Sequence, residues 1–313
     1  MENKKRLVIT GAAGLVGQNL IVRLKRLGFR DIAGIDCHPA NTRTLKRLHP
    51  DLEVIFADLA EHGEWEKAVA GADTLVICHA QIGGQHPVLF RKNNIQATEN
   101  LLDVAVTNNI DHIVHVSSSV VESIAVDDYA VTKEKQEKLV LNCGLPACAF
   151  RPTLMFGWFD RKHIGWLSHF IRRTPVFPIP GDGKYIRQPL YAGDFCNILI
   201  SSIQDRRAGE VFNISGLEKI YYVDLVKTLK SATGAHAAIV RIPYRLFWYL
   251  LKIYGVFDRD PPFTTSQLEA LVLPEEFEII DWPQIFKVTP TPLTVAFQET
   301  FRHPEYSKIT LEF

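Results

Sequence analysis

Short, continuously apolar runs alternate with helix-like segments through the first half of the chain. The apolar runs are 7–10, 32–35, 54–56, 74–77 and 113–116. Segments with helical spacing lie at 15–27, 64–69, 94–107 and 129–141. Strands that are apolar on both faces and separated by helices are typical of a parallel sheet covered on both sides. The pattern therefore predicts an α/β fold built on a Rossmann-type doubly wound parallel sheet.

The pattern changes after Arg151. Prolines and glycines cluster between 175 and 183, aromatic residues become more frequent, and the periodicity is less regular. Strands are expected at 211–214 and 238–240, with a helix near 223–230. We therefore predict a first domain at 1–175, to which 189–214 returns, and a smaller mixed α/β lobe at 176–313.

Composition excludes several classes of protein. The 313 residues carry 35 Lys+Arg against 35 Asp+Glu, and this balance argues against a nucleic-acid binder. Five cysteines without CxxC or Cys/His ligand spacing indicate free thiols in a reducing compartment and no metal site. The N-terminus lacks a secretory pattern, and no apolar run reaches about 18 residues, so we expect no transmembrane segment and a cytoplasmic protein.

A glycine-rich turn joins the first strand to the first helix. Glycines here permit a tight turn and a close approach of the backbone to pyrophosphate, and the helix N-terminus attracts phosphate charge. Because the turn stands in the strand–turn–helix context that a dinucleotide site requires, it predicts a set of binding residues. These are Gly11, Gly14, Leu15, Val16 and Gly17.

An acidic residue stands where such a site needs one. Asp36 ends the second strand, 19 residues beyond Gly17. A carboxylate there accepts hydrogen bonds from the ribose hydroxyls and repels a 2′-phosphate, which favours NAD over NADP, although Arg43 nearby could accommodate that phosphate. Asp58 and Leu59 follow the third strand and are placed to reach the adenine; a turn or cap role is the alternative for Asp58.

Tyr129 and Lys133 are four residues apart and share one helix face. A phenol with a pKa of about 10 is a poor base, and a neighbouring ammonium lowers that pKa. We therefore expect Tyr129 to exchange a proton with a substrate hydroxyl or carbonyl while hydride moves to or from a nicotinamide.

These motifs together resemble the extended short-chain dehydrogenase/reductase family of nucleotide-sugar epimerases, dehydratases and reductases. The GxxGxxG spacing of the turn and the YxxxK pair carry the resemblance, together with His79-Ala80 after the fourth strand and Asn94 on the next helix. The resemblance implies that His79 and Ala80 lie near the cofactor, that Asn94 supports the active-site strand, and that Lys133 also holds the nicotinamide ribose. We also expect a homodimer.

The family's third catalytic member is a Ser or Thr just past the fifth strand. The family register implies Ser118, with Ser117 second and Ser119 still open. Two features after Ser118 depart from the family pattern. Glu122-Ser123 stands where relatives carry Tyr-Gly, and only 11 residues separate Ser118 from Tyr129, so a loop that walls the nicotinamide end is missing. Ser119-Val120 replaces the Asp-Glu of family dehydratases, which argues against a 4,6-dehydratase.

The resemblance implies two substrate contacts in the second half. Thr153 stands in the stretch where many epimerases bind the nucleotide, and Arg187 lies seven residues before Asp194, as in the family pattern of a diphosphate-binding arginine. A structural ion pair is the alternative for Arg187, and Asp194 is expected at a helix start or between lobes. The aromatic segment 244–257 is expected in the core or an oligomer interface, with a membrane surface or an apolar pocket as alternatives.

Three hypotheses for the function follow. The first is an NAD-dependent 4-epimerase or ketoreductase acting on a nucleotide sugar. The second keeps the chemistry on an apolar alcohol, as in enzymes that resemble 3β-hydroxysteroid dehydrogenase. The third is a non-catalytic dinucleotide-binding regulator or assembly factor, which the Tyr129/Lys133 pair opposes.

Overall fold

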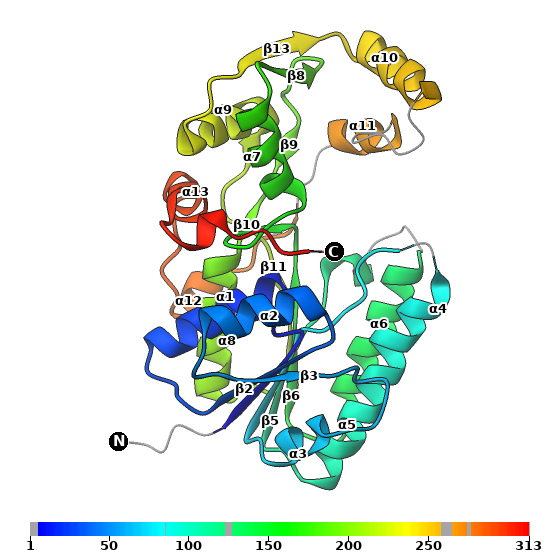
Figure 1. The fold of residues 1–313 in the computed structure, drawn as a ribbon, viewed down its shortest axis with the longest axis vertical. Coiled ribbons are helices and arrows are strands. Elements are labelled where there is room, and N and C mark those ends of the chain that lie inside the picture. Colours follow the sequence, from blue (N-terminus) through cyan, green and yellow to red (C-terminus); the bar gives the residue numbers. More distant parts are fainter. Residues whose placement is uncertain (1–5, 85, 123–126, 258–264, 274–276, 313) are drawn as a thin grey trace.

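A computed structural model describes residues 6–84, 86–122, 127–257, 265–273 and 277–312. Its larger half is a seven-stranded sheet in the order β11-β6-β5-β4-β1-β2-β3, with every neighbouring pair parallel (Figure 1). The strands are β1 (Leu7–Thr10), β2 (Ile32–Asp36), β3 (Glu53–Phe56), β4 (Thr74–Ile77), β5 (His112–Val116), β6 (Ala147–Pro152) and β11 (Val211–Ile214). The predicted doubly wound α/β fold is confirmed, and the five strands expected in the first half agree with the structure to within one residue at each end.

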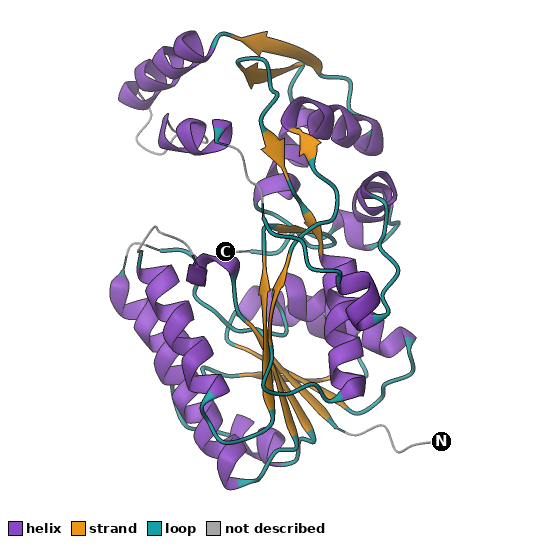
Figure 2. Cartoon of the chain, turned by 180° about the vertical axis from the view of Figure 1, so that it is seen from behind, coloured by secondary structure: helices purple, strands orange, loops and turns teal. Residues whose placement is uncertain are grey.

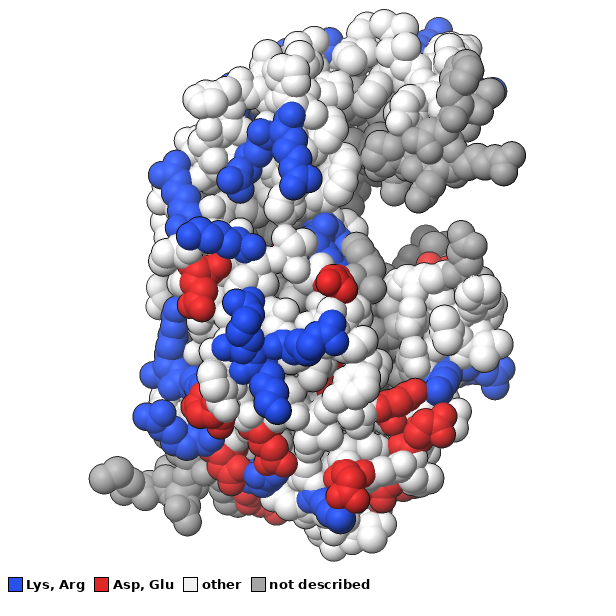
Figure 3. All heavy atoms as spheres, viewed as in Figure 1, with Lys and Arg blue, Asp and Glu red and all other residues white. Residues whose placement is uncertain are grey.

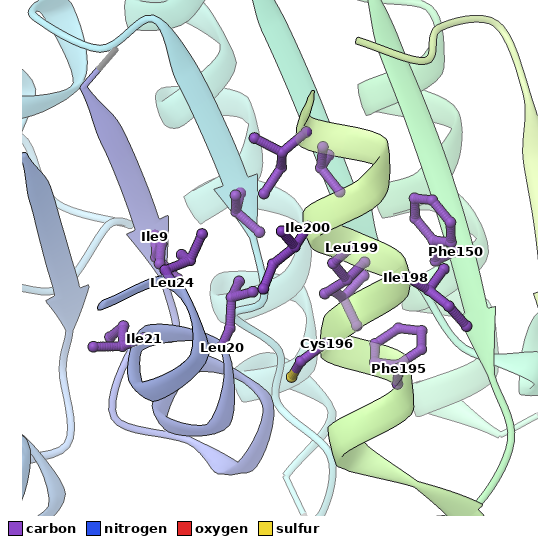
Figure 4. Close-up of a cluster of buried hydrophobic side chains, with 14 of the residues drawn as sticks. Ile9, Leu20, Ile21, Leu24, Phe150, Phe195, Cys196, Ile198, Leu199 and Ile200 are labelled. Carbon is purple, nitrogen blue, oxygen red and sulfur yellow. The ribbon is translucent and has the colours of Figure 1, made fainter. Parts of the chain in front are cut away.

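Helices cover both faces of this sheet. One face carries α1 (Leu15–Arg26), α2 (Pro39–Leu48), α8 (Ala192–Asp205) and α12 (Trp282–Phe286); the other carries α3 (Trp65–Ala70), α5 (Ala97–Thr107) and α6 (Asp128–Leu141). On the first face, Leu20 and Leu24 of α1 meet Leu199 of α8 above Ile9 and Phe150 of the sheet (Figure 4). Each fully buried side chain of this kind contributes about 1.5–3 kcal/mol of transfer free energy, so this layer holds α8 firmly against the sheet.

The smaller lobe is built from short strand pairs and helices, seen from behind in Figure 2. Its strands are β7 (Met155–Phe156), β8 (Val176–Pro180), β9 (Ile186–Arg187), β10 (Leu190–Tyr191), β12 (Ile220–Tyr221) and β13 (Ala238–Ile242). Its helices are α7 (His163–Arg173), α9 (Tyr222–Thr233), α10 (Tyr244–Phe257), α11 (Thr265–Val272) and α13 (Leu293–Arg302). The pairs β7·β10 and β8·β13 are parallel and β9·β12 is antiparallel, so the lobe is of mixed α/β type.

Two segments pack across the predicted division at 175/176. The α7 residue Ile171 is buried with Phe177 and Val226 of the smaller lobe, although α7 precedes the division. Trp282 and Phe286 of α12 are buried in the layer that α1 and α8 form on the sheet, although they follow the division. The return of 189–214 to the sheet as α8 and β11 is observed, while the division itself stays a prediction.

Short elements connect β4 and β5 to the helices that follow them. The helix α4 (Pro87–Phe90) leads into a π-helical turn, Arg91–Gln96, which continues as α5. A 3-10 turn at Ser119–Glu122 follows β5. Such π turns are frequent at functional sites. Among the described residues, no helix combines the length and apolar character needed to cross a membrane.

Candidate active site

The glycine turn leaves no room for side chains. A Cβ on Gly11, whose φ is +65°, would lie 2.6 Å from the backbone nitrogen of His79. A Cβ on Gly17 would lie 2.5 Å from the carbonyl oxygen of Gly11. Gly14 precedes α1 without a capping side chain, so the N–H groups of Leu15, Val16 and Gly17, in the first turn, face away from any intrahelical acceptor. The turn therefore presents backbone donors at a helix N-terminus, as a phosphate site requires.

Asp36 braces this turn from the end of β2. Its carboxylate accepts hydrogen bonds from the N–H of Ala13 at 2.9 Å and of His38 at 2.8 Å. Burial raises the pKa of Asp36 even though both N–H groups act to lower it. Arg43 is exposed on α2. The carboxylate thus stands beside the glycine turn, where the sequence predicts the ribose contact.

Asp58 and Leu59 follow β3 with different surroundings. Asp58 accepts a hydrogen bond from the N–H of Ala60 at 2.9 Å and pairs with Lys92 at 2.8 Å, an arrangement that fits its turn-forming alternative. Burial opposes the charge of Asp58, but Lys92 and that N–H lower its pKa overall. Leu59 is buried against the α3/α5 side of the sheet. An adenine contact for the pair stays a prediction.

The ends of β4 and β1 are joined by a buried polar chain. Nδ1 of His79 lies 2.8 Å from Oγ1 of Thr10, and Nε2 lies 3.1 Å from Oγ1 of Thr98. Because the Thr98 hydroxyl donates to the carbonyl of Asn94, Nε2 of His79 is the donor and Nδ1 the acceptor. Burial and the nearby Lys133 lower the pKa of His79 to about 3, so the ring is neutral. Ala80 follows it, half-buried.

Asn94 connects the loop after β4 to α6. Its Oδ1 accepts from the N–H of Gln81 at 2.6 Å, and its Nδ2 donates to Oγ1 of Thr132 at 2.9 Å. Asn94 is fully buried within the π-helical turn. The structure therefore gives Asn94 a bridging position between the cofactor edge and the helix that carries Tyr129.

Ser118 and Tyr129 are brought together at the carboxyl end of β5. The carboxylate of Asp127 caps α6 by accepting from the N–H of Ala130 at 2.7 Å, which sets Tyr129 in the first turn. The Ser118 side chain is close enough to the Tyr129 hydroxyl to act to lower its pKa. The buried Ser117 hydroxyl has no hydrogen-bond partner among the described residues, and Ser119 begins the 3-10 turn. The choice of Ser118 among the three serines stays a prediction.

Lys133 is almost fully buried one turn beyond Tyr129. Its Nζ donates to the carbonyl of Val116 at 3.0 Å and to Oε1 of Gln136 at 2.6 Å. These bonds use two of the three donors of an ammonium group. Burial lowers the pKa of Lys133 to about 7, although Cys78 and Glu137 act to raise it. The neutral amine is therefore more accessible to Lys133 than to an exposed lysine.

The expected lowering of the Tyr129 pKa is not what the structure shows. Burial raises the pKa of Tyr129, and the Ser118 side chain offsets this only partly. The charge of Asp127 raises the pKa further. The expectation was wrong because it weighed the charge of Lys133 and omitted the cost of burying a phenolate.

Two parts of the site were missed by the sequence analysis. Gln136 is fully buried, and its Nε2 donates to Oγ1 of Thr98 at 2.9 Å and to the carbonyl of His79 at 3.2 Å, linking Lys133 to the β4 end. The available signal was a polar residue at i+7 from Tyr129, on the same helix face.

The second missed feature is an ion network after β5, at the segment that departs from the family pattern. Arg151 makes a bidentate pair with Glu137 of α6 at 2.9 and 2.6 Å, and it also bonds Glu122 at 2.5 Å. Glu122 accepts in addition from the amide of Asn213 on β11. Glu122, which stands where relatives carry Tyr, thus connects the 3-10 turn to β6 and β11. Ser123 lies outside the described residues.

The predicted substrate contacts, Thr153 and Arg187, come after Tyr129 and Lys133 in the sequence. Thr153, just after β6, is buried, and its hydroxyl has no hydrogen-bond partner among the described residues. Arg187 is buried above the Tyr185 ring and donates to the carbonyls of Ile186 and Leu273, at 2.7 and 2.8 Å, and of Leu271. It therefore binds the carboxyl end of α11.

Asp194 stands in the first turn of α8, which fits its expected helix-start role, and it also bonds a segment that leads into the smaller lobe. Its carboxylate accepts from the backbone N–H of Thr291 at 2.9 Å and from the hydroxyl of the same residue at 2.6 Å. These bonds connect α8, on the sheet, to the segment that leads into α13. Burial raises the pKa of Asp194.

The profile of the NAD dependent epimerase/dehydratase family matches residues 7–215. The chain belongs to this family. It is therefore an NAD-dependent enzyme, and the hypothesis of a non-catalytic regulator does not stand.

Known relatives extend the comparison beyond this match. The chain is 28% identical to the low-salt glycan biosynthesis protein Agl12 of Haloferax volcanii, over 74% of this chain and 84% of that protein. It is 26% identical to the 3 beta-hydroxysteroid dehydrogenase/Delta 5-->4-isomerase of Mycobacterium tuberculosis, over 76% and 72% of the two chains. The fold resembles that of UDP-glucuronic acid 4-epimerase from Bacillus cereus in complex with NAD, with a TM-score of 0.72, 21% identity, and 95% and 97% of the two chains covered.

The packing of the glycine turn leads to a first prediction. Gly17→Ala forces a methyl group to 2.5 Å from a backbone oxygen, so we expect at least a hundredfold loss of NAD affinity and a loss of about 1–3 kcal/mol in the free energy of unfolding. Fluorescence titration with NADH and urea unfolding measure the two effects. Gly63→Ala is the matched control, because its nearest neighbour would lie at 3.7 Å. Unchanged NAD affinity in Gly17→Ala would contradict the assignment of this turn.

The burial of Lys133 leads to a second prediction. The folded pKa of about 7 lies below the ordinary value of 10.5, so between these values the unfolded state binds more protons and stability rises with pH. The free energy of unfolding of the wild type, minus that of Lys133→Met, should increase by about 3 kcal/mol from about pH 6 to about pH 9. Urea unfolding at each pH measures this difference. Lys135 is exposed on the same helix, so Lys135→Met, the control, should give a difference that does not vary with pH. A pH-independent difference for Lys133→Met would rule out the buried-amine interpretation.

Proposed function

We propose that the protein binds NAD and catalyses hydride transfer at a secondary alcohol or ketone of a nucleotide sugar, as a 4-epimerase or a ketoreductase. One observation carries the proposal. Tyr129, near Ser118 and followed one turn later by the buried Lys133, stands at the carboxyl edge of β5, in the same sheet as the glycine turn after β1. Ligands of open α/β sheets bind at this edge.

The residues at the turn fit NAD. Gly11 and Gly17 stand where a Cβ would collide with backbone, which is the close approach that a pyrophosphate needs. The Asp36 carboxylate at the end of β2 would accept hydrogen bonds from the adenosine ribose and repel a 2′-phosphate, so NAD is preferred to NADP. When bound, NAD supplies the acceptor and donor of hydride.

The chain's own groups handle the proton and the reacting oxygen. Ser118 donates to the substrate oxygen and holds it beside Tyr129. Because burial raises the pKa of Tyr129, its neutral phenol would donate a proton to the carbonyl oxygen during reduction. The reverse oxidation requires the Tyr129 phenolate, which would take the carbinol proton as hydride leaves the substrate. Lys133 would steady this exchange: Val116 and Gln136 accept two of its donors, and in the ammonium form a third would be available for the nicotinamide ribose.

Thr153 and Arg187 are the proposed substrate contacts. The buried Thr153 hydroxyl is a donor without a protein partner among the described residues. Arg187 would meet the diphosphate, and for this it must share or exchange the carbonyls at the end of α11 that it now binds. The Agl12 relative is named for glycan biosynthesis, which favours a sugar substrate.

A second candidate substrate is an apolar alcohol. The sequence identity to the mycobacterial hydroxysteroid dehydrogenase, 26%, is close to the 28% shared with Agl12. In addition, donors of Arg187 already bind protein carbonyls, which weakens the case for a substrate phosphate there. The two substrate classes share Ser118, Tyr129 and Lys133, so only a substrate panel separates them.

The assigned proton exchange gives the third prediction. Tyr129→Phe removes the hydroxyl that moves the proton, so kcat should fall by about 10²–10⁴ while NAD affinity stays within about twofold. The assay is a panel of uridine- and guanosine-diphosphate sugars with a sterol alcohol as the apolar arm. The exposed Tyr221→Phe is the matched control. Activity retained in Tyr129→Phe would overturn the proton-transfer role, and turnover of the sterol alone would overturn the sugar assignment.

The carboxylate of Asp36 gives the fourth prediction, on cofactor choice. Asp36→Asn keeps an acceptor oxygen for the N–H of Ala13 but removes the charge that repels a 2′-phosphate. The ratio of NADP to NAD affinity should rise by at least tenfold, measured by titration with both reduced cofactors. Asp103→Asn, exposed on α5, should leave the ratio unchanged. An unchanged ratio in Asp36→Asn would mean that another group selects the cofactor.

A further inference from the structure

The helix α10 presents a continuous apolar face to solvent. Leu246, Tyr249, Leu250, Ile253 and Tyr254 recur at spacings of three and four, and each is 47–60% exposed. Residues at these spacings lie on one side of a helix. We call these five residues the α10 face. Single exposed apolar side chains are ordinary on a protein surface, but five large ones gathered on one helix mark an interaction site.

The opposite side of α10 packs against the protein. Trp248 Nε1 donates to Oε1 of Glu269 on α11 at 3.0 Å, and Phe247 and Leu251 are half-buried. Figure 1 places α10 at the outer end of the smaller lobe, with α11 on its inner side. The α10 face therefore looks away from the body of the described structure, and its orientation is fixed by the α11 contact.

The two charged residues of α10 itself, Arg245 and Lys252, are both cations, while Glu269 of the adjoining α11 accepts from Trp248 on the opposite side of the helix. Residues 225–257 contain five Lys or Arg and no Asp or Glu, although the whole chain has equal numbers of each sign. Arg245 and Lys252 border the α10 face on the side of Tyr249, and Lys252 Nζ lies 4.9 Å from the centre of the Trp248 ring. Figure 3 shows Lys and Arg side chains at the top edge of the molecule, where α10 lies. An apolar stripe bordered by cations and aromatic rings is complementary to an anionic lipid surface.

The length of α10 decides how it would meet such a surface. Its 14 residues span about 21 Å, whereas crossing a bilayer takes about 20 residues. A second copy of the chain is a poorer occupant, because a two-fold contact through the same helix would bring Arg245 and Lys252 of both copies to one interface. Tyr and Trp side chains are also favoured at the headgroup level.

We propose that the α10 face is a membrane-association surface, by which α10 lies in the headgroup layer of a bilayer that carries anionic lipid. The apolar side chains enter the boundary between headgroups and acyl chains, and Arg245 and Lys252 remain among the lipid phosphates. This surface is separate from Ser118, Tyr129 and Lys133, and the proposal does not depend on the reaction that the enzyme catalyses.

The test is co-sedimentation of the full chain with vesicles of phosphatidylcholine alone or with about one-third phosphatidylglycerol. We expect at least tenfold stronger partitioning onto the anionic vesicles at about 0.1 M salt. That preference should disappear at about 1 M salt, where screening shortens the range of charge interactions from about 10 Å to about 3 Å. Absence of binding to anionic vesicles at low salt would overturn the proposal.

Two variants separate the apolar and charged contributions. Leu250→Ser/Ile253→Ser should weaken partitioning at least tenfold on every vesicle that binds. Arg245→Gln/Lys252→Gln should remove the preference for anionic lipid, since each cation near such a surface accounts for about fivefold in binding. The controls are Val106→Ser/Val295→Ser, also exposed apolar residues, and Lys46→Gln/Arg47→Gln on α2. Equal losses in the controls would overturn the assignment to α10.

Two further measurements keep the result unambiguous. Thermal unfolding and NADH titration should be the same for all variants as for the wild type, which shows that any loss of vesicle binding is not a loss of fold. Light scattering gives the oligomeric state. A wild-type dimer that Leu250→Ser/Ile253→Ser dissociates, without vesicle binding by the wild type, would assign the α10 face to self-association and overturn the membrane proposal.

Discussion

The active-site edge of the molecule depends on the close backbone contact between β1 and β4. Thr10 is in register with Ile77, and the next residue, Gly11, comes so near the His79 backbone that a methyl group would overlap it. This contact brings the glycine turn and the His79 segment to the same edge. Because β5 continues the register from β4, Ser118 arrives at that edge as well. The proposed cofactor turn and the proposed reacting centre are therefore positioned by one sheet rather than by independent loops.

The close contact between β1 and β4 buries several polar side chains. One continuous chain of hydrogen bonds gives these side chains partners. Thr10, His79, Thr98, Gln136 and Lys133 are linked in succession. The arrangement holds His79 neutral and brings the pKa of Lys133 to about 7. A buried amine costs stability unless its donors are satisfied, and Val116 and Gln136 supply the acceptors. The same low dielectric that shifts Lys133 raises the pKa of Tyr129, so the two members of the YxxxK pair move in opposite directions.

Local patterns in the sequence predict most of the sheet half. Continuous apolar runs locate five strands, and the helical spacing around Tyr129 and Lys133 places both residues on one face of α6. The missed strand β6 contains Arg151 and Pro152, which interrupt the apolar signal although Phe150 is completely buried. The roles of Gln136 and Glu122 depend on partners far away in the chain, such as His79 and Arg151, and no local spacing reveals such contacts. The aromatic segment was expected mainly in a core or interface, because the sequence cannot tell which side of an amphipathic helix has a partner.

Arg187, the proposed contact for a substrate phosphate, already binds groups of the protein. Its guanidinium binds carbonyls at the carboxyl end of α11, where the helix dipole concentrates negative charge. Glu269 of α11 accepts a hydrogen bond from Trp248 of α10. A substrate phosphate at Arg187 would compete for the N–H groups that these carbonyls engage. Zero net charge over the whole chain does not argue against local anion sites, because those proposed here rest on a helix N-terminus, on Arg187 and on the two cations of α10.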